Sequence, residues 1–361
     1  MTNVTTSRRN ARAGALLALF LCVCAGCGDA PRATVRAPAA AEPAASLAQA
    51  AWRAAARVSS PIDAGRETIG VAGQLAAVGR GGLLEPHLQE QREAWIRAGL
   101  LAHAASAASL EGNVSRARAL LAEARTAAGA TTEWRRPMTL PVLGRAEALL
   151  LLAPPSGGTN ALLRWAAAEP AERAEPAARA ALQKALHSPT APDAPPLLSV
   201  SLQLAQALPV WMRLEIMAQA VASPVATAAQ REMGVAAADA LCGTNDVGRT
   251  AEPDVLANLV WLYGAGGREA RAGELRAQFR ARLDEKGFED LSGAWTCLAR
   301  LHAAQARPDD AKDAFRKALD AARARPGFQH DVALARTLAA MAVSGLKWTD
   351  EEVAAAIRAA E

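Results

Sequence analysis

The residues able to act as metal ligands or catalytic bases are few and widely spaced. No two histidines stand four residues apart, as they do when one helix face holds a metal ion, and no cysteine–histidine spacing typical of zinc sites occurs. His302 falls on the apolar stripe of an expected helix, which indicates a packed side chain. The sequence therefore predicts no metal site. The five histidines are His87, His103, His187, His302 and His330.

Other patterns that could support catalysis have a structural explanation in this chain. The paired acids Asp309–Asp310 and Glu351–Glu352 stand at expected helix starts, where the helix dipole favours acidic side chains. The glycine-rich segments 79–82 and 264–267 have no strand before them, so they indicate turns at helix ends rather than phosphate-binding loops. No G-x-S-x-G motif or P-loop is present. We therefore expect no catalytic residues and no cofactor, and we do not expect an enzyme.

The first 26 residues have the properties of an export signal. Residues 1–12 carry three arginines and no acid, and a short apolar run follows from Ala13 to Ala25. This run is too short for a stable membrane-spanning helix, and no later run reaches the required length. Export to an oxidising compartment would permit a disulfide between Cys242 and Cys297, although two buried, unpaired thiols are the favoured alternative.

The segment Cys24-Ala25-Gly26-Cys27 resembles the lipobox of bacterial lipoproteins, although Cys24 stands where leucine is usual. In that family the signal peptide, here residues 1–26, is removed and the last cysteine is lipidated. The resemblance therefore implies lipidation of Cys27, and Gly28 in place of aspartate implies the outer membrane, with the protein facing the periplasm. Cleavage by ordinary signal peptidase near Ala30, which would release a secreted protein, is the alternative.

Charge and composition exclude several classes of protein. The chain has 40 basic and 36 acidic residues, but without the three signal arginines the balance is 37 to 36, so nothing indicates a nucleic-acid partner. Alanine makes up about a quarter of the chain and aromatics 4%, which favours helices over a large sheet. Residues 27–45 are rich in proline and alanine, so they are predicted to form a tether.

Residues 292–325 show the clearest helical pattern. Trp295, Leu298, Ala299 and His302 are spaced i, i+3, i+4 and i+7, as on the buried face of one helix. Pro308 interrupts the pattern, and a second helix with its own apolar stripe follows. The spacing therefore predicts a helical hairpin.

This hairpin resembles a tetratricopeptide repeat (TPR), whose period is 34 residues. His302 stands where that family usually has tyrosine, Ala306 where it has glycine, and the closing proline comes late, at Pro326. Residues 98–131 resemble the repeat more weakly, and a third, partial copy ends near Ala272. The six residues that match the family spacing are Trp295, Leu298, Ala299, Ala311, Phe315 and Ala318.

The resemblance, with helical periodicity from residue 46 onward, predicts an all-α protein: a right-handed α-solenoid of antiparallel helical hairpins. It would have an N-terminal helical-repeat region (46–187) and a C-terminal one (197–361). The proline-rich segment 188–196 is either a linker between these halves or a surface loop, and the loop is favoured because similar hairpins flank it.

The last helix, within residues 349–361, is predicted to cap the solenoid. Thr349 and Glu352 have the spacing of a capping box, and Trp348 and Val353 that of a hydrophobic staple. The acids of its first turn would give the polar outer face that a terminal repeat requires.

The family resemblance also implies a mode of action. In tetratricopeptide repeats the first helices line a concave groove that holds a partner protein. The matching positions are Thr296 and Arg300 in the clearest unit, and Ser106 and Ser109 in the weaker copy. We therefore expect an interaction scaffold for protein partners in the bacterial cell envelope. It would meet the membrane only through its lipid anchor and use neither nucleic acid nor a small-molecule cofactor.

An exported all-α glycosidase or polysaccharide lyase of the α/α-toroid type is the alternative function. Such enzymes need paired carboxylates and aromatic platforms for sugars. A single tyrosine and scattered tryptophans argue against this alternative.

Overall fold

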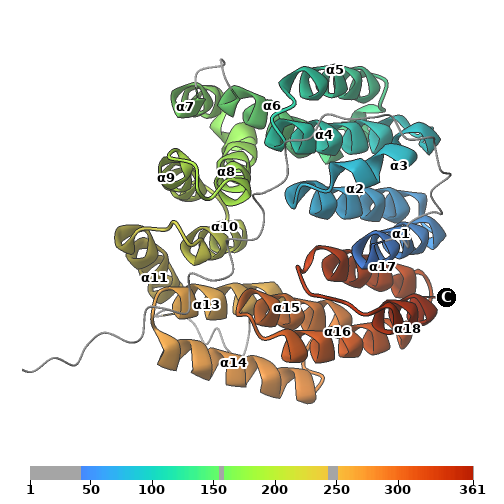
Figure 1. Cartoon of the computed structure of the whole chain (residues 1–361), viewed down its shortest axis with the longest axis vertical. Helices are drawn as coiled ribbons and strands as arrows, with labels where there is room; N and C mark the ends of the chain where they lie inside the picture. The colour runs from blue at the N-terminus through green and yellow to red at the C-terminus, as the bar shows by residue number, and fades with distance from the viewer. Residues whose placement is uncertain (1–41, 154–157, 243–250, 361) are drawn as a thin grey trace, which may run out of the picture. The chain divides into compact units, whose positions relative to one another are not determined.

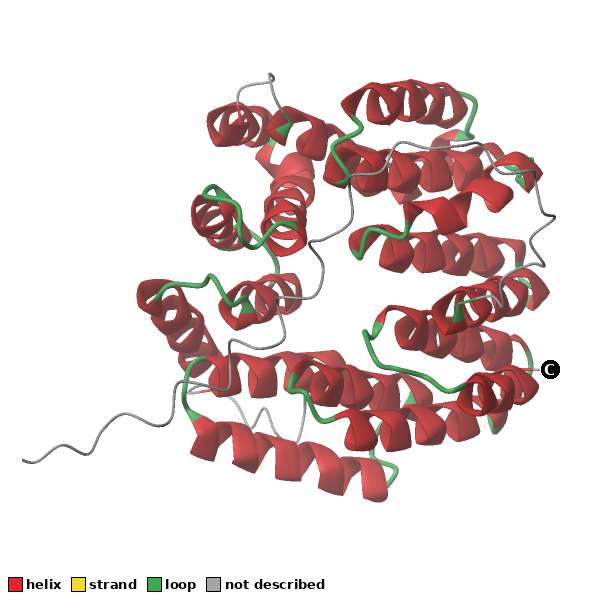
Figure 2. Ribbon diagram, in the orientation of Figure 1, coloured by secondary structure: helices red, strands yellow, loops and turns green. Residues whose placement is uncertain are grey.

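The computed structural model describes residues 42–153, 158–242 and 251–360. Within these residues the chain forms helices joined by turns and loops, and no strand occurs in them (Figure 2). They all belong to one compact unit, residues 41–361. The predicted all-α class is confirmed. The expected signal peptide and almost all of the expected tether lie outside the described residues.

One set of helices makes contacts in a closed circuit. Each helix of the set contacts the next one, and the last contacts the first (Figure 1). The circuit consists of α2 (Pro61–Ala77), α4 (Ala94–Leu110), α6 (Leu140–Leu152), α8 (Pro170–His187), α10 (Val210–Ala222), α13 (Pro253–Ala265), α15 (Leu291–Ala304) and α17 (Phe328–Val343).

The other α-helices flank this circuit. Most of them follow a circuit helix in the chain and pack against that helix or the next one. The chain thus forms a series of helical hairpins, each made of one circuit helix and one flanking helix. These helices are α1 (Pro43–Arg57), α3 (Glu85–Glu90), α5 (Val114–Gly129), α7 (Gly158–Ala168), α9 (Ala194–Ala205), α11 (Ala228–Cys242), α14 (Glu269–Asp284), α16 (Pro308–Arg323) and α18 (Asp350–Ala360). The proline-rich residues 188–193 connect α8 to α9, which pack against each other.

Three hairpins have the same turn geometry. The turns after α4, α13 and α15 each contain one residue with positive φ, namely Gly112 (82°), Gly267 (77°) and Ala306 (54°). In each turn the next backbone N–H bonds back to the carbonyl five residues earlier, as in Arg307 N–H to His302 O at 2.9 Å. The clearest unit, 292–325, therefore begins its second helix after a turn in which alanine holds a conformation suited to glycine.

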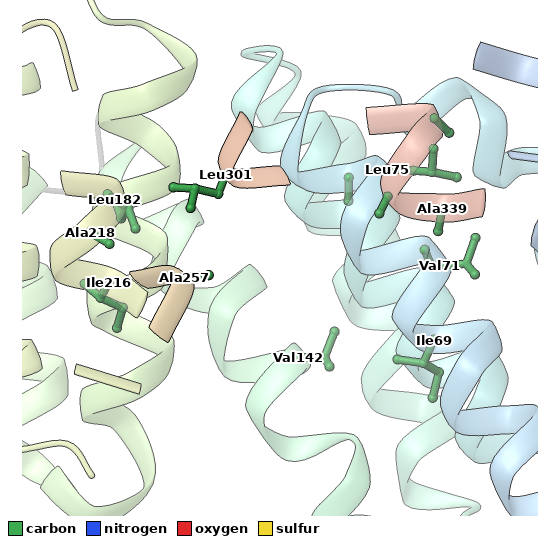
Figure 3. Close-up of a cluster of buried hydrophobic side chains, with 14 of the residues drawn as sticks. Ile69, Val71, Leu75, Val142, Leu182, Ile216, Ala218, Ala257, Leu301 and Ala339 are labelled. Carbon is green, nitrogen blue, oxygen red and sulfur yellow. The ribbon is translucent and has the colours of Figure 1, made fainter. Parts of the chain in front are cut away.

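The circuit closes where α17 packs against α1 and α2. Arg336 on α17 forms a two-armed ion pair with Glu67 on α2, with Nη2–Oε1 and Nε–Oε2 distances of 2.6 and 2.9 Å. Glu67 is 7% exposed. Leu75 of α2 and Ala339 of α17 are both fully buried in the core, and Figure 3 labels them. Segments from the two ends of the described chain thus share one apolar core.

The closure involves the helix that the sequence predicts as a cap, within residues 349–361. The predicted capping box does form, because Thr349 N donates to Glu352 Oε2 (2.8 Å) and Glu352 N donates to Thr349 Oγ1 (3.2 Å). However, α18 packs against α1 as well as α16, and Arg57 on α1 bonds to the carbonyl oxygen of Ala360. The last helix therefore joins the first one rather than ending an open stack.

Small side chains allow the helices to pack closely around a few large ones. Many alanines on α1, α4, α8, α15 and α17 are buried. The largest fully buried side chains include Trp95, Tyr263, Phe279 and Phe315. Trp95 lies so close to Gly65 that a Cβ at Gly65 would come within 2.2 Å of its ring. Alanine and glycine therefore set the helix spacing, as the composition indicated.

Candidate functional site

The structure separates the four expected groove residues. Arg300 is exposed on α15 and lines a hollow. Ser106 and Ser109 on α4 are 2% and 3% exposed, because α4 is covered by α2, α5 and α6. Thr296 is 8% exposed, and its Oγ1 donates to Ser292 O at 2.9 Å. The two serines and Thr296 thus contribute to helix packing, and only Arg300 presents its side chain to solvent.

Arg300 borders a cleft of about 200 Å³ between α10, α13 and α15, which we call the α13 cleft. Asp254, Asn258 and Trp261 are spaced i, i+4 and i+7, so one face of α13 turns all three side chains into the cleft. Glu215 and Gln219 of α10 face them. Ala257 and Leu301 form part of the apolar floor, and both lie among buried side chains of the circuit helices (Figure 3).

A cluster of charged residues supports the cleft from α8 and α10. Arg179 binds Glu215 through two nitrogens, with Nη2–Oε2 and Nη1–Oε1 distances of 2.8 and 3.2 Å. Its Nε donates to Glu175 at 2.6 Å. The charges of Arg179, Glu175 and Glu215 act on Arg145 of α6. The Nε of Arg145 is buried without a hydrogen-bond partner. The acids of α8 and α10 are therefore held by arginine before any ligand arrives.

The cluster fixes the protonation states of its members. Burial acts to raise the pKa of Glu215, but the hydrogen bonds and charge of Arg179, with Arg300 and Arg145 further away, outweigh burial and lower it. Burial and the charge of Arg179 lower the pKa of Arg145 to about 10, against the pull of Glu175 and Glu215. At neutral pH Glu215 is thus a carboxylate and Arg145 a cation.

Glu215 makes the stability of the fold depend on pH in an acidic window. Because its folded pKa lies below the ordinary value of 4.5, Glu215 adds stability above that value, and this stability is lost as the pH falls through the folded pKa. The variant E215Q lacks this contribution. Urea unfolding at several pH values should show the largest gap between wild type and E215Q above about pH 5 and a shrinking gap below about pH 4. A gap that stays constant with pH would contradict the assignment.

The two cysteines of the body of the protein are free thiols. Burial raises the pKa of Cys297 to about 11; Arg300 opposes this shift, whereas Asp254 adds to it. Cys297 borders the cleft as a neutral, weakly nucleophilic thiol. This agrees with the sequence interpretation that favoured unpaired thiols, although both side chains are half-buried rather than fully buried.

The buried histidines are neutral and have no acidic hydrogen-bond partner. Burial and the nearby Arg145 lower the pKa of His103 to about 3. His302 lies buried on α15, as its place on the apolar stripe indicated, and its Nδ1 has no hydrogen-bond partner. Among the described residues no group of three or more histidines, cysteines and acids is arranged to hold a metal ion.

Several cleft residues carried a signal that the sequence interpretation missed. Asp254, Asn258 and Trp261 form a polar and aromatic stripe on an otherwise apolar helix, and Glu175 and Arg179 have the i, i+4 spacing of a helical ion pair. No local sequence pattern indicated that Glu215 would pair with Arg179, because the two residues are 36 positions apart in the chain.

Comparisons with known proteins add no family to this description. No family model matches the chain, and no curated protein or solved structure matches it. In the part of the chain that the structure describes, no helix combines the length and the apolar character needed to cross a bilayer. The function is therefore inferred from the geometry of the α13 cleft.

Proposed function

We propose that this protein is a lipid-anchored interaction scaffold of the bacterial cell envelope, which binds a segment of a partner protein in the α13 cleft. We infer from the resemblance of residues 292–325 that its hairpins are TPR-like repeats. The observation that carries the proposal is the stripe of Asp254, Asn258 and Trp261 facing Arg300 across an open cleft. These four side chains form no hydrogen bond or ion pair with one another, so they are available to bind a ligand.

The cleft has the size and chemistry for an extended peptide. The stripe spans eight residues of α13, from Asp254 to Trp261, and is about 10 Å long, which equals about three residues of an extended chain. The side-chain amides of Asn258 and Gln219 each offer a donor and an acceptor, as a peptide backbone does. Ala257 between them leaves room for a backbone to approach, and Trp261 offers an apolar surface for one side chain.

The state of Glu215 favours binding over catalysis. A catalytic acid in a glycosidase needs a raised pKa so that it stays protonated at neutral pH. Glu215 has the opposite shift, because Arg179 holds it as a carboxylate. Such a fixed carboxylate can orient a ligand, but it cannot donate a proton to a leaving group.

The second candidate function is an exported all-α enzyme acting on glycans. It is favoured by the closed circuit of helices and by the two carboxylates, Glu215 and Asp254, that line one cleft with Trp261. Release of reducing ends from envelope glycans by the wild type, with loss of that release in D254N, would support this candidate against the scaffold.

Anchoring rests on Cys27, which lies outside the described residues. In the producing bacterium the variant C27S should move from the membrane fraction to the soluble envelope fraction, because the residue that receives the lipid is gone. Fractionation followed by immunoblotting measures this. Continued sedimentation of C27S with membranes would remove lipidation from the proposal and leave cleft binding to be judged separately.

Binding through the cleft predicts a charge-sensitive partner. Wild-type protein should retain its partner after purification from solubilised membranes, whereas R300E should retain at most about a tenth of it, since a lost charge-assisted contact costs about 1.5–3 kcal/mol. R316E is the matched control, because Arg316 is an exposed arginine on the flanking helix α16. Equal retention by R300E and R316E would exclude the cleft as the binding surface.

A further inference from the structure

A second hollow, of about 430 Å³, lies next to the α13 cleft, and we call it the end pocket. Trp261 borders both hollows. The end pocket is lined by residues from the C-terminal ends of α13 and α15 and from the first half of α14. Its volume falls in the range of small-molecule sites. The remaining lining residues are Ala222, Gly264, Ala265, Glu269, Arg276, Ala304, Gln305 and Arg307.

The end pocket contains polar groups that lack partners in the protein. Arg276 Nε and Gln305 Oε1 are buried and make no hydrogen bond. Arg276 contrasts with its neighbours on α14, since Arg271 binds Glu274 and Arg280 binds Asp284. A buried donor or acceptor without a partner destabilises the protein, so a ligand that supplies both partners is favoured.

The surroundings of the pocket are positively charged. Burial and the charges of Arg307, Arg276 and Arg280 lower the pKa of His302 to about 4, although Asp310 acts in the opposite direction. Arg307 is held by Asp310 through two nitrogens at 2.8 Å, but no acid holds Arg276 among the described residues. An anionic group on a ligand would therefore pair with Arg276 in preference to Arg307, which is already paired with Asp310.

We propose that the end pocket binds an acidic sugar residue of an envelope polysaccharide. The sugar carboxylate pairs with Arg276, and its hydroxyls donate to Gln305 Oε1 and to the carboxylate of Glu269. The apolar face of the sugar ring lies against Trp261. This site is separate from the partner-binding role of the α13 cleft, and it would fix the scaffold to a glycan layer as well as to a membrane.

The balance of donors and acceptors favours a sugar over a peptide end. The pocket offers two acceptors to a ligand: Gln305 Oε1, which is buried without a partner, and the exposed carboxylate of Glu269, which forms no ion pair with another described residue. A sugar acid carries several hydroxyl donors beside its carboxylate. A peptide C-terminus carries one backbone N–H donor beside its carboxylate, so its backbone can satisfy only one of the two acceptors.

Titration calorimetry of the full mature chain with a trimer of galacturonic acid tests the proposal. We expect measurable binding by the wild type, at least tenfold weaker binding of the uncharged galactose trimer, and at least tenfold weaker binding of the acidic trimer by R276Q. R271Q is the matched control, because Arg271 lies on the same helix and faces Glu274, and it should bind as the wild type does. Q305E, which adds a negative charge, should also weaken binding at least tenfold.

Thermal unfolding of each variant distinguishes a lost site from a lost fold. If R276Q has a lower unfolding temperature than the wild type, the binding of the acidic trimer by Q305E and of the neutral trimer by the wild type tests the site instead. The proposal is overturned if the folded wild type binds no acidic trimer, if R276Q or Q305E binds it as well as R271Q does, or if a peptide with a free C-terminus binds through Arg276 and the trimer does not. Retention of the cleft partner by R276Q is expected in every case, so the two sites are judged independently.

Discussion

Replacement of Arg179 by alanine is expected to lower the free energy of unfolding by about 3–5 kcal/mol, the range found when one partner of a buried ion pair is removed. Arg179 is largely buried and neutralises Glu175 and Glu215 from two different helices. Without it both partly buried carboxylates lose the cation that pairs with them, and α8 loses its ion pair with α10. Urea unfolding at pH 7 measures the change.

Two comparison variants isolate the cause of this loss. R316A removes an arginine that pairs with Asp313 on the surface, and it should cost less than about 1 kcal/mol. The double variant R179L/E215L should recover part of the loss, because it removes the uncompensated charge of Glu215 together with its partner. An effect of R179A no larger than that of R316A would show that the cluster does not support the cleft.

Replacement of Trp95 by alanine should destabilise the protein by a similar amount, about 3–5 kcal/mol, because a fully buried aromatic ring leaves a cavity. Trp95 is 2% exposed on α4 and fills the space beside Gly65 of α2. A Cβ at Gly65 would lie 2.2 Å from the ring carbons, so G65A alone should cost about 1–3 kcal/mol through overpacking.

The double variant W95A/G65A tests whether these two effects share one contact. Its loss should be smaller than the sum of the single losses, because the added methyl group enters the cavity left by the indole. Chemical unfolding of the four proteins gives the coupling. Strict additivity would mean that α2 and α4 do not meet at this point.

Local features of this fold could be predicted from the sequence because short-range patterns determine them. The helix pair of residues 292–325 follows from the stripe around Trp295 and the break at Pro308, and the structure contains both helices as α15 and α16. The capping box of Thr349 and Glu352 depends on residues three apart, and it forms as expected.

Closure of the circuit could not be predicted in the same way. It depends on contacts between residues far apart in the chain, such as Glu67 with Arg336, and a single helical pattern does not encode which helices become neighbours. The helical pattern of residues 349–361 predicted a terminal cap, and nothing in that pattern indicated that α17 and α18 would pack against α1.

The candidate site shows the same division between local and distant signals. Arg300 was found because it matches a groove position of the resembled repeat. Ser106 and Thr296 matched in the same way, but they are buried because neighbouring helices cover them on both sides. Gln219 and Asn258, which line the cleft together with Arg300, come from two other circuit helices. These residues come together only when the circuit helices pack, so no local sequence pattern predicts that they share one cleft.

Site-specific photo-crosslinking in living cells would show directly whether a partner protein lies in the α13 cleft. A benzophenone amino acid is placed at Asn258 inside the cleft, and, in a second protein, at Arg316 on the flanking helix α16. We expect one adduct of defined mass at position 258, its loss when R300E is added, and no adduct at position 316. No adduct at position 258, or the same adduct from both positions, would contradict a partner held in the cleft.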